Sequence, residues 1–150
     1  MSNIDVNKVK ELRESTGLSF GEIKKALEES GGDEAKTMEI LKNLGSKMAD
    51  KKSDRELKSG IVEAYIHGFN KGAMIELLCE SDFVARNAGF KELAHDIAMQ
   101  VAATKPANVE ELMEQEFIKD PAMKIRDLVN SNIAKIGENI QVGRFEVFEI

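Results

Sequence analysis

Long apolar runs, a basic net charge and paired cysteines are all missing from this sequence of 150 residues. No stretch approaches the ~20 apolar residues that a membrane-spanning helix needs, so we expect no membrane insertion. The 27 acidic residues outnumber the 21 basic ones, and a net charge of −6 argues against binding to nucleic acid. The single cysteine, Cys79, cannot form an internal disulfide. Because the first residues also show no basic region leading into an apolar signal core, we expect a cytoplasmic protein.

Motifs of nucleotide, calcium and metal sites are equally missing. The sequence contains no G-x-x-x-x-G-K-[ST], no G-x-G-x-x-G and no EF-hand loop, so we predict no bound nucleotide or cofactor. His67 and His95 have no cysteines or carboxylates at ligand spacing, which favours ordinary histidines over a metal site or a general base. A catalytic thiolate needs a positive setting, whereas Glu80 and Asp82 follow Cys79 closely. We therefore expect no active site for covalent chemistry.

One enzyme motif is present in its literal form. Gly17-Leu18-Ser19-Phe20-Gly21 matches the G-x-S-x-G of serine hydrolases, in which the serine sits on a strained turn between a strand and a helix. Here the segment joins two stretches with the apolar spacing of helices. Ser19 and Glu22 form an S-x-x-E capping box, in which each side chain satisfies a backbone donor at a helix start. The capping box explains Ser19 without a nucleophile.

Residues 1–45 are expected to form a domain of three short helices. Gly17, Gly31-Gly32 and Gly45 supply the three stops, and Asp33 can cap the third helix. Helices of roughly ten residues are too short to be stable alone, so they must pack on one another. The apolar positions that carry the helical spacing are Ile4, Val6, Val9 and Leu12, then Phe20, Ile23, Ala26 and Leu27, then Ala35, Met38, Leu41 and Leu44.

Residues 46–58 hold five bases, three acids and almost no apolar side chains. This composition favours a solvated linker or a frayed helix. A basic patch for a phosphate-bearing partner is the alternative.

Residues 59–150 are expected to form an α+β domain with an antiparallel sheet of three strands packed with helices. Side chains alternate along the strand that begins at Ser59, and Gly68–Gly72 supplies a hairpin turn. The order strand, strand, helices, strand gives the fold class. The later strands are expected at 73–79 and 139–150, and the helices at 88–104, at 109–117 and from the cap-proline pair Asp120-Pro121 to Gly137.

The last expected strand carries apolar residues on both faces, with Phe145 and Val147 on one and Phe148 and Ile150 on the other. Either Gly143 forms a bulge that switches the faces, or the second face meets another surface.

Charged side chains flank an apolar pair between the second strand and the following helix. Phe83 and Val84 lie between Asp82 and Arg86. Phe83 either folds back as a staple under the helix, which the pattern alone favours, or stands out as an apolar wedge for a partner.

Four segments of the chain resemble bacterial elongation factor Ts: Val9–Gly17, Lys24–Leu27, Ser81–Asn87 and Ala134–Ile140. Residues 1–45 resemble the family's ubiquitin-associated-like three-helix domain, and residues 59–150 resemble one copy of its core module for exchange or dimerisation. Residues 46–58 would link the two. In this interpretation the chain is a short member, without the duplicated core and the helical-hairpin insertion of longer relatives.

The resemblance implies guanine-nucleotide exchange on elongation factor Tu, in its GDP-bound and nucleotide-free forms, with no covalent chemistry. One loop would displace the partner's magnesium ion, and other residues would press near its phosphate-binding loop or dock on another of its helices. The loop residues are Ser81, Asp82, Phe83 and Val84, the residues near the phosphate-binding loop are Ile136 and Gly137, and the docking residues are Leu12 and Phe20.

The sequence departs from the family pattern at three places. Ser81 stands where threonine is usual, and Phe20-Gly21 replaces the Met-Met of many relatives, so the docking patch loses one side chain. Some short relatives carry a cysteine in the last strand, where this chain has Glu146, so a homodimer through that strand would be non-covalent. The alternative function is a non-catalytic adaptor, in which the helical domain binds a peptide or a ubiquitin-like partner and the sheet domain dimerises. An adaptor needs no exposed Phe83.

Overall fold

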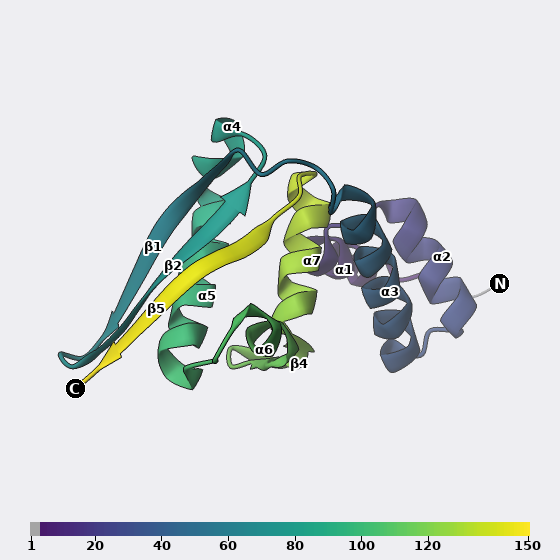
Figure 1. Cartoon of the computed structure of the whole chain (residues 1–150). Coiled ribbons are helices and arrows are strands. Elements are labelled where there is room, and N and C mark those ends of the chain that lie inside the picture. The colour runs from purple at the N-terminus through teal and green to yellow at the C-terminus, as the bar shows by residue number, and fades with distance from the viewer. Residues whose placement is uncertain (1–3) are drawn as a thin grey trace. The chain divides into compact units, whose positions relative to one another are not determined.

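Figure 1 shows a computed structural model of the chain, which describes residues 4–150. The α+β fold class is confirmed, with a helical N-terminal part and an antiparallel three-stranded sheet. In chain order the elements are α1 (Val6–Thr16), α2 (Phe20–Ser30), α3 (Glu34–Lys52), β1 (Ser59–His67), β2 (Lys71–Cys79), α4 (Asp82–Ala85), α5 (Ala88–Thr104), α6 (Val109–Glu114), β3 (Glu116–Phe117), β4 (Asp120–Lys124), α7 (Ile125–Ile136) and β5 (Gln141–Glu149).

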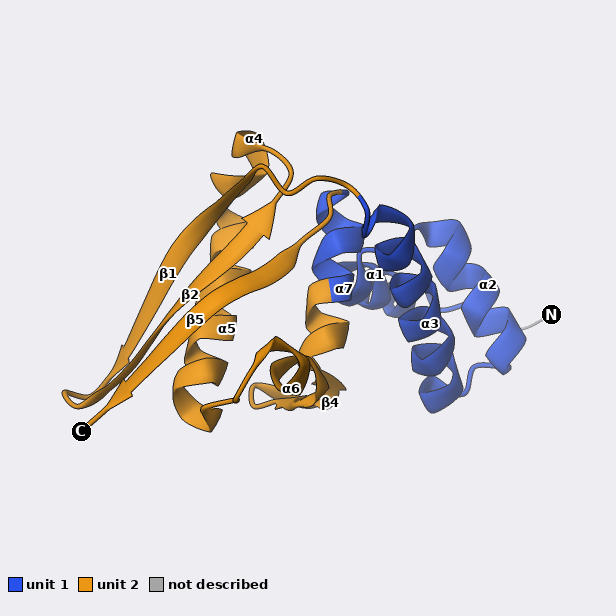
Figure 2. Ribbon diagram, viewed as in Figure 1, with its two compact units in different colours: residues 1–54, 130–137 blue, residues 55–129, 138–150 orange. Residues whose placement is uncertain are grey.

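The chain divides into two compact units, coloured separately in Figure 2. The helical unit comprises the described residues up to Asp54 together with Asn130–Gly137. The α+β unit comprises Arg55–Val129 and Glu138–Ile150. Helix α7 therefore contributes its first residues to the α+β unit and its later residues to the helical unit.

Side-chain caps define the helices of the helical unit. Asp5, Ser19 and Asp33 accept hydrogen bonds from backbone N–H groups in the first turns of α1, α2 and α3. The capping box differs from the expected form at Glu22. Its carboxylate accepts a hydrogen bond from the Ser19 hydroxyl, at 3.0 Å. The helices enclose an aliphatic core, and the prediction of a packed helical cluster is confirmed. Its fully buried members are Val9, Leu12, Leu18, Ile23, Ala26 and Leu41.

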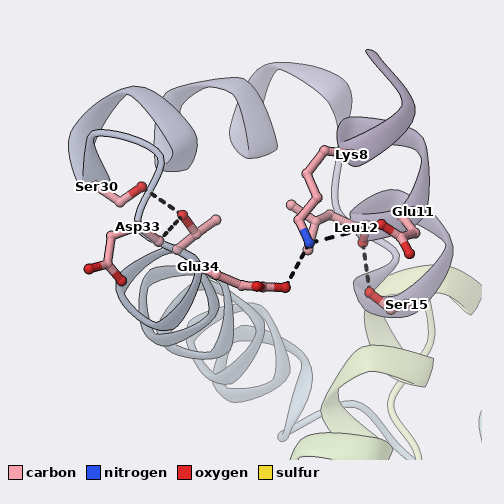
Figure 3. A network of polar contacts seen from close by, with 8 residues as sticks. Lys8, Glu11, Leu12, Ser15, Ser30, Asp33 and Glu34 are labelled. Carbon is pink, nitrogen blue, oxygen red and sulfur yellow. Dashed lines mark hydrogen bonds and ion pairs between the residues drawn. The ribbon is translucent and has the colours of Figure 1, made fainter. Parts of the chain in front are cut away.

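A polar network joins α1 to α3 on the surface of the helical unit (Figure 3). The Lys8 Nζ lies 2.7 Å from Glu34 Oε1 and 3.9 Å from Glu11 Oε2. The hydrogen bond from Lys8 lowers the pKa of Glu34, and the same contact raises the pKa of Lys8. Between α2 and α3 the hydroxyls of Ser30 and Thr37 are 2.6 Å apart.

The expected stop of the third helix at Gly45 is wrong, because α3 continues to Lys52. Gly45 is buried inside the helix, and a Cβ placed on it would lie 4.0 Å from Asn130 Cβ. Gly45 is therefore an interior residue of α3 with room for a Cβ and not a left-handed cap. Residues 46–52, for which the sequence favoured a solvated linker or a frayed helix, are helical. The helix ends where the Ser53 N–H reaches the Asp50 carbonyl.

The sheet of the α+β unit has the strand order β1-β2-β5, with both pairings antiparallel, as the sequence predicted. Helix α5 covers one face of this sheet (Figure 1). Alternation along β2 decides which residues face α5, because every second side chain from Ala73 to Cys79 is buried. Across from them α5 buries Phe90, Leu93, Ala94, Ile97, Ala98 and Val101.

A bulge interrupts the pairing of β5 with β2, as the first of the two alternatives for Gly143 predicted. Ile75 pairs with Phe145 and Leu77 pairs with Val142, so Gly143 and Arg144 both lie opposite Glu76. A Cβ on Gly143 would lie 2.9 Å from Glu76 Oε1, so no larger residue fits there without a shift. Apolar side chains nevertheless remain exposed on the face away from α5, among them Phe148 and Ile66.

The helix expected to start at Asp120-Pro121 begins later, and this prediction is wrong. Asp120 pairs with Phe117 in the hairpin of β3 and β4, and its Oδ1 accepts the Ala122 N–H at 3.2 Å. Proline is acceptable there because a two-stranded sheet consists of edge strands. Helix α7 starts at Ile125, where Asp127 Oδ2 accepts the Lys124 N–H at 3.0 Å.

Candidate functional site

The turn after β2 presents one aromatic side chain to solvent. Ser81 caps the four-residue helix α4, and its Oγ accepts the Val84 N–H at 3.3 Å. Val84 is 5% exposed, whereas the neighbouring Phe83 is 84% exposed. The staple alternative for Phe83 is therefore wrong: Val84 anchors the turn and Phe83 projects from it.

Two further bonds hold the start of α4. The Asp82 carboxylate accepts the Ser59 hydroxyl at 2.7 Å, which ties the turn to the first residue of β1. The Cys79 thiol donates to the Ser81 carbonyl at 3.3 Å. Burial, followed by the charge of Glu138, raises the pKa of Cys79. A fully buried thiol with a raised pKa is a packing residue and not a nucleophile.

Two carboxylates join the base of the turn to the segment before β5. Glu138 Oε1 accepts the N–H groups of Glu80 and Ser81, each at 3.0 Å, and Glu138 Oε2 accepts the Ser81 hydroxyl at 2.6 Å. In the other direction, Glu80 Oε2 accepts the Asn139 N–H at 2.6 Å. We call these four residues, Glu80, Ser81, Glu138 and Asn139, the carboxylate clamp.

The other candidate residues lie in the helical unit. Gly137 ends α7 in a left-handed conformation with φ +85°, and its N–H donates to the Ile133 carbonyl at 2.8 Å. Gly137 is exposed and Ile136 is half-buried, so this turn is accessible. Phe20 is 47% exposed at the start of α2. Leu12, in contrast, is 5% exposed and packs in the helical core, so it supports the surface from inside.

Comparisons with known proteins identify the family of the chain. The sequence model described as "Elongation factor TS" matches residues 80–150, which include the turn after β2 and α7. Proteins named elongation factor Ts from Thermodesulfovibrio yellowstonii, Herpetosiphon aurantiacus and Oleidesulfovibrio alaskensis are each 40% identical to the chain. The alignments cover 98%, 99% and 100% of this chain and 96%, 98% and 99% of the three relatives.

The chain belongs to the elongation factor Ts family. Its role therefore lies in the elongation step of protein synthesis, and the resemblance that the sequence showed is confirmed. The chain spans nearly the whole length of these relatives, so membership extends to both units.

Other candidate chemistry has a structural explanation in this member of the elongation factor Ts family. Ser19 caps α2 in a turn between two helices, so the strand that a serine nucleophile needs is missing from this position.

The two histidines both contact Tyr65. The Tyr65 hydroxyl lies 3.0 Å from His67 Nδ1, and the Tyr65 ring meets the His95 ring edge-on with 5.6 Å between the ring centres. Within residues 4–150 no group of three or more His, Cys, Asp or Glu side chains could hold a metal ion. Within the same residues no helix is long and apolar enough to cross a membrane.

Sequence reasoning missed part of the surface around Phe20. A groove beside Phe20 is lined by residues of α1, of the α1–α2 turn and of the end of α7. The signal was available for α1, because Val6, Lys10 and Arg13 follow one another at helical spacing on the side away from the core. The contribution of Lys135 was not readable, since it comes from a helix more than a hundred residues later in the chain.

Proposed function

We propose that this chain is a guanine-nucleotide exchange factor that binds elongation factor Tu in its GDP-bound and nucleotide-free forms. It acts in the cytoplasm, without covalent chemistry. The Asp82-Phe83 turn displaces the partner's magnesium ion, with Ser81 and Val84 holding the turn. The observation that carries the proposal is the exposure of Phe83, 84%, beside a Val84 that is 5% exposed. An aromatic ring held outward in the free protein is what an interface anchor requires.

The two parts of the chain divide the work in this proposal. Residues 59–150 act on the magnesium site, while residues 1–45 dock through the surface around Phe20, and residues 46–58 connect them. The turn at Ile136 and Gly137 presses near the phosphate-binding loop of the GTPase. Gly21 adds no side chain to the docking surface, and Phe20 supplies its aromatic contact.

The mechanism is coupled binding. Whatever factor the exchange factor imposes on the affinity for GDP, GDP imposes on the affinity for the exchange factor in return. A differential stabilisation of ~4 kcal/mol accelerates release by ~10³-fold. Burial of one Phe side chain contributes only ~1.5–3 kcal/mol, so Phe83 shares the effect with the other contacts.

The test is release of a fluorescent GDP analogue from elongation factor Tu in excess unlabelled nucleotide. Wild type should accelerate release, and Phe83→Ala should remove most of the acceleration while the circular dichroism spectrum is unchanged. Ile118→Ala is the control, since Ile118 is an exposed apolar residue of the β3–β4 hairpin outside the proposed surfaces. Equal rates for Phe83→Ala and wild type contradict the wedge. No acceleration by wild type contradicts exchange activity and favours the adaptor.

We also propose that two copies associate through the last strand, β5, on the face of the sheet away from α5. This face carries the Glu76–Arg144 ion pair and exposes four large apolar side chains, those of Val62, Ile66, Met74 and Phe148. Large contiguous apolar patches on a protein surface mark interaction sites. Glu146 lies on the same face beside Met74, so the association has no disulfide. Sedimentation equilibrium should show a monomer–dimer equilibrium that Phe148→Glu shifts to monomer; a monomer at every concentration contradicts the proposal.

A further inference from the structure

The carboxylate clamp continues the contact between β2 and β5 beyond the end of their ladder. The last backbone pair of the two strands is Leu78 with Gln141. Past that pair, the backbone of Glu80 and Ser81 is held by the Glu138 side chain, and the backbone of Asn139 is held by the Glu80 side chain. Side chains thus replace backbone carbonyls as acceptors at the point where the chain leaves the sheet for α4.

The chemistry of the clamp suits a carboxylate at position 138 better than any neutral group. Three donors, two backbone N–H groups and the Ser81 hydroxyl, converge on it. An ionised carboxylate only accepts, and its charge makes such bonds shorter and roughly twice as strong as neutral ones. Glu138 and Ser81 are half-buried, which reduces competition from water.

The hydrogen bond between Glu138 and the Ser81 hydroxyl also orients that hydroxyl toward α4. Since that hydroxyl donates its hydrogen to Glu138 Oε2, its lone pairs are left to accept the Val84 N–H. Val84 is the buried anchor of the turn, and Phe83 directly precedes it. The path from Glu138 to Phe83 therefore contains two hydrogen bonds and one peptide unit.

We infer that Glu138 is a positioning residue for nucleotide exchange: through Ser81 it holds α4 in the orientation that presents Phe83 to the partner. The inference rests on the proposed function. A turn that is ordered before the encounter loses less conformational freedom on binding than one that is ordered during it. Loss of the clamp should therefore reduce the acceleration of GDP release that Phe83 produces. It should not remove any direct contact between Glu138 and the partner.

The experiment compares Glu138→Ala and Glu138→Gln in the nucleotide-release assay, with Glu110→Ala and Glu110→Gln as controls. Glu110 is exposed in α6 and belongs to none of the proposed surfaces. We expect Glu138→Ala to lower the maximal release rate about ten-fold, a barrier change of ~1.4 kcal/mol. Glu138→Gln should recover part of this loss, because one amide oxygen can still accept both N–H groups. Both Glu110 variants should match wild type.

A double-mutant cycle with Phe83→Ala separates positioning from a general loss of structure. If Glu138 acts through Phe83, Glu138→Ala should have little further effect once Phe83 is Ala. Additive effects of the two substitutions overturn the inference.

Hydrogen exchange of the free protein supplies a readout that does not depend on activity. The amides of Glu80, Ser81 and Val84 should lose protection in Glu138→Ala while those of α5 keep theirs. Unchanged protection of the three amides overturns the inference that Glu138 orders the turn. If wild type fails to accelerate GDP release, the proposed function is contradicted. The hydrogen-exchange data still decide whether Glu138 orders the turn.

Discussion

The helical unit and the α+β unit differ in how many of their large apolar side chains are exposed. In the helical unit the large apolar residues turn inward, and the strongly exposed ones are Val6 and Phe20. The α+β unit buries one face of its sheet under α5 and exposes apolar residues elsewhere. These exposed residues are Val62, Ile66, Phe69, Met74, Phe83, Ile118, Phe148 and Ile150.

This difference separates side chains that stabilise the fold from side chains that are available to partners. Helices α1 and α2 of the helical unit end in glycines and leave a groove beside Phe20. The α+β unit buries its sheet on the α5 side and leaves apolar side chains of the other face and Phe83 of α4 exposed. The comparison predicts that substitutions of similar size have very different costs in the layer between α5 and the sheet and on the open face of the sheet.

The largest expected effect tests that contrast directly. Phe90 is 0% exposed under the sheet and Phe148 is 73% exposed on the open face. We expect Phe90→Ala to lower the free energy of unfolding by about 3–5 kcal/mol, because it leaves a cavity in the core. Phe148→Ala should change it by less than about 0.5 kcal/mol at low protein concentration. Urea unfolding of the two variants, followed by circular dichroism, measures both values.

A large cost of Phe148→Ala would break the comparison, since it would mean that the open face is covered. The concentration dependence then identifies the cover. If the cost grows with protein concentration, a second copy covers the face, and if it is independent of concentration, the chain itself does.

The next effect concerns the helical unit. Gly17 has φ +73°, and a Cβ on it would lie 2.6 Å from the Lys135 backbone nitrogen. Gly17→Ala therefore combines a left-handed strain with a backbone clash, and we expect a loss of about 2–4 kcal/mol in stability. Gly21→Ala is the matched control, because nothing lies within 4 Å of its added Cβ and alanine favours the helix.

Hydrogen exchange shows where the loss from Gly17→Ala falls. Amides of α2 should lose protection while those of β2 keep theirs, because Gly17 and Lys135 both belong to the helical unit. Equal loss of protection in α2 and β2 would show that the cores of the two units do not open independently.

Sequence reasoning predicted those parts of the fold that depend on local patterns. The caps at Ser19, Asp33 and Asn87, the glycine stops after α1, α2 and α7, and the alternation in β1 and β2 were readable from residues close in sequence. The bulge at Gly143 was one of two predicted alternatives, because an internal glycine in a strand that is apolar on both faces is typical of a switch between faces. The two boundary errors, at Gly45 and Asp120, arose where the same local signal occurs inside a helix or in a hairpin.

The candidate site was predictable in composition but not in conformation. Sequence pattern alone favoured a buried Phe83, and only the structure shows the ring exposed. The bonds that hold the turn join residues 57 and 58 positions apart, and no local pattern reports such contacts. Helical spacing placed Leu12 on the packing face of the first helix, where the structure buries it, whereas the family resemblance implied that it docks on the partner.

The smallest expected effect compares one carboxylate in each unit by its response to acid. Arg144, through its side chain and its backbone N–H, lowers the pKa of Glu76 from 4.5 to about 2, and Lys8 lowers the pKa of Glu34. A lowered pKa in the folded state stabilises the fold above the unfolded value near 4.5, and this contribution is lost as the pH falls toward 2. Glu76→Gln should therefore be less stable than wild type at pH 7, and the difference should shrink to a small remainder near pH 2.

Urea midpoints at a series of pH values between 7 and 2 measure this difference, with Glu34→Gln as the control in the helical unit. The Glu34 variant should show the same direction with a smaller change, because exposed ion pairs on helices contribute little. Glu76 differs because Arg144 donates three hydrogen bonds to it at the bulge, one from its backbone N–H and two from its guanidinium. Protonation of Glu76 therefore loosens the register of β5 as well as an ion pair. A stability difference between wild type and Glu76→Gln that stays constant over this pH range would show that the bulge depends on the shape of the Glu76 side chain and not on its charge.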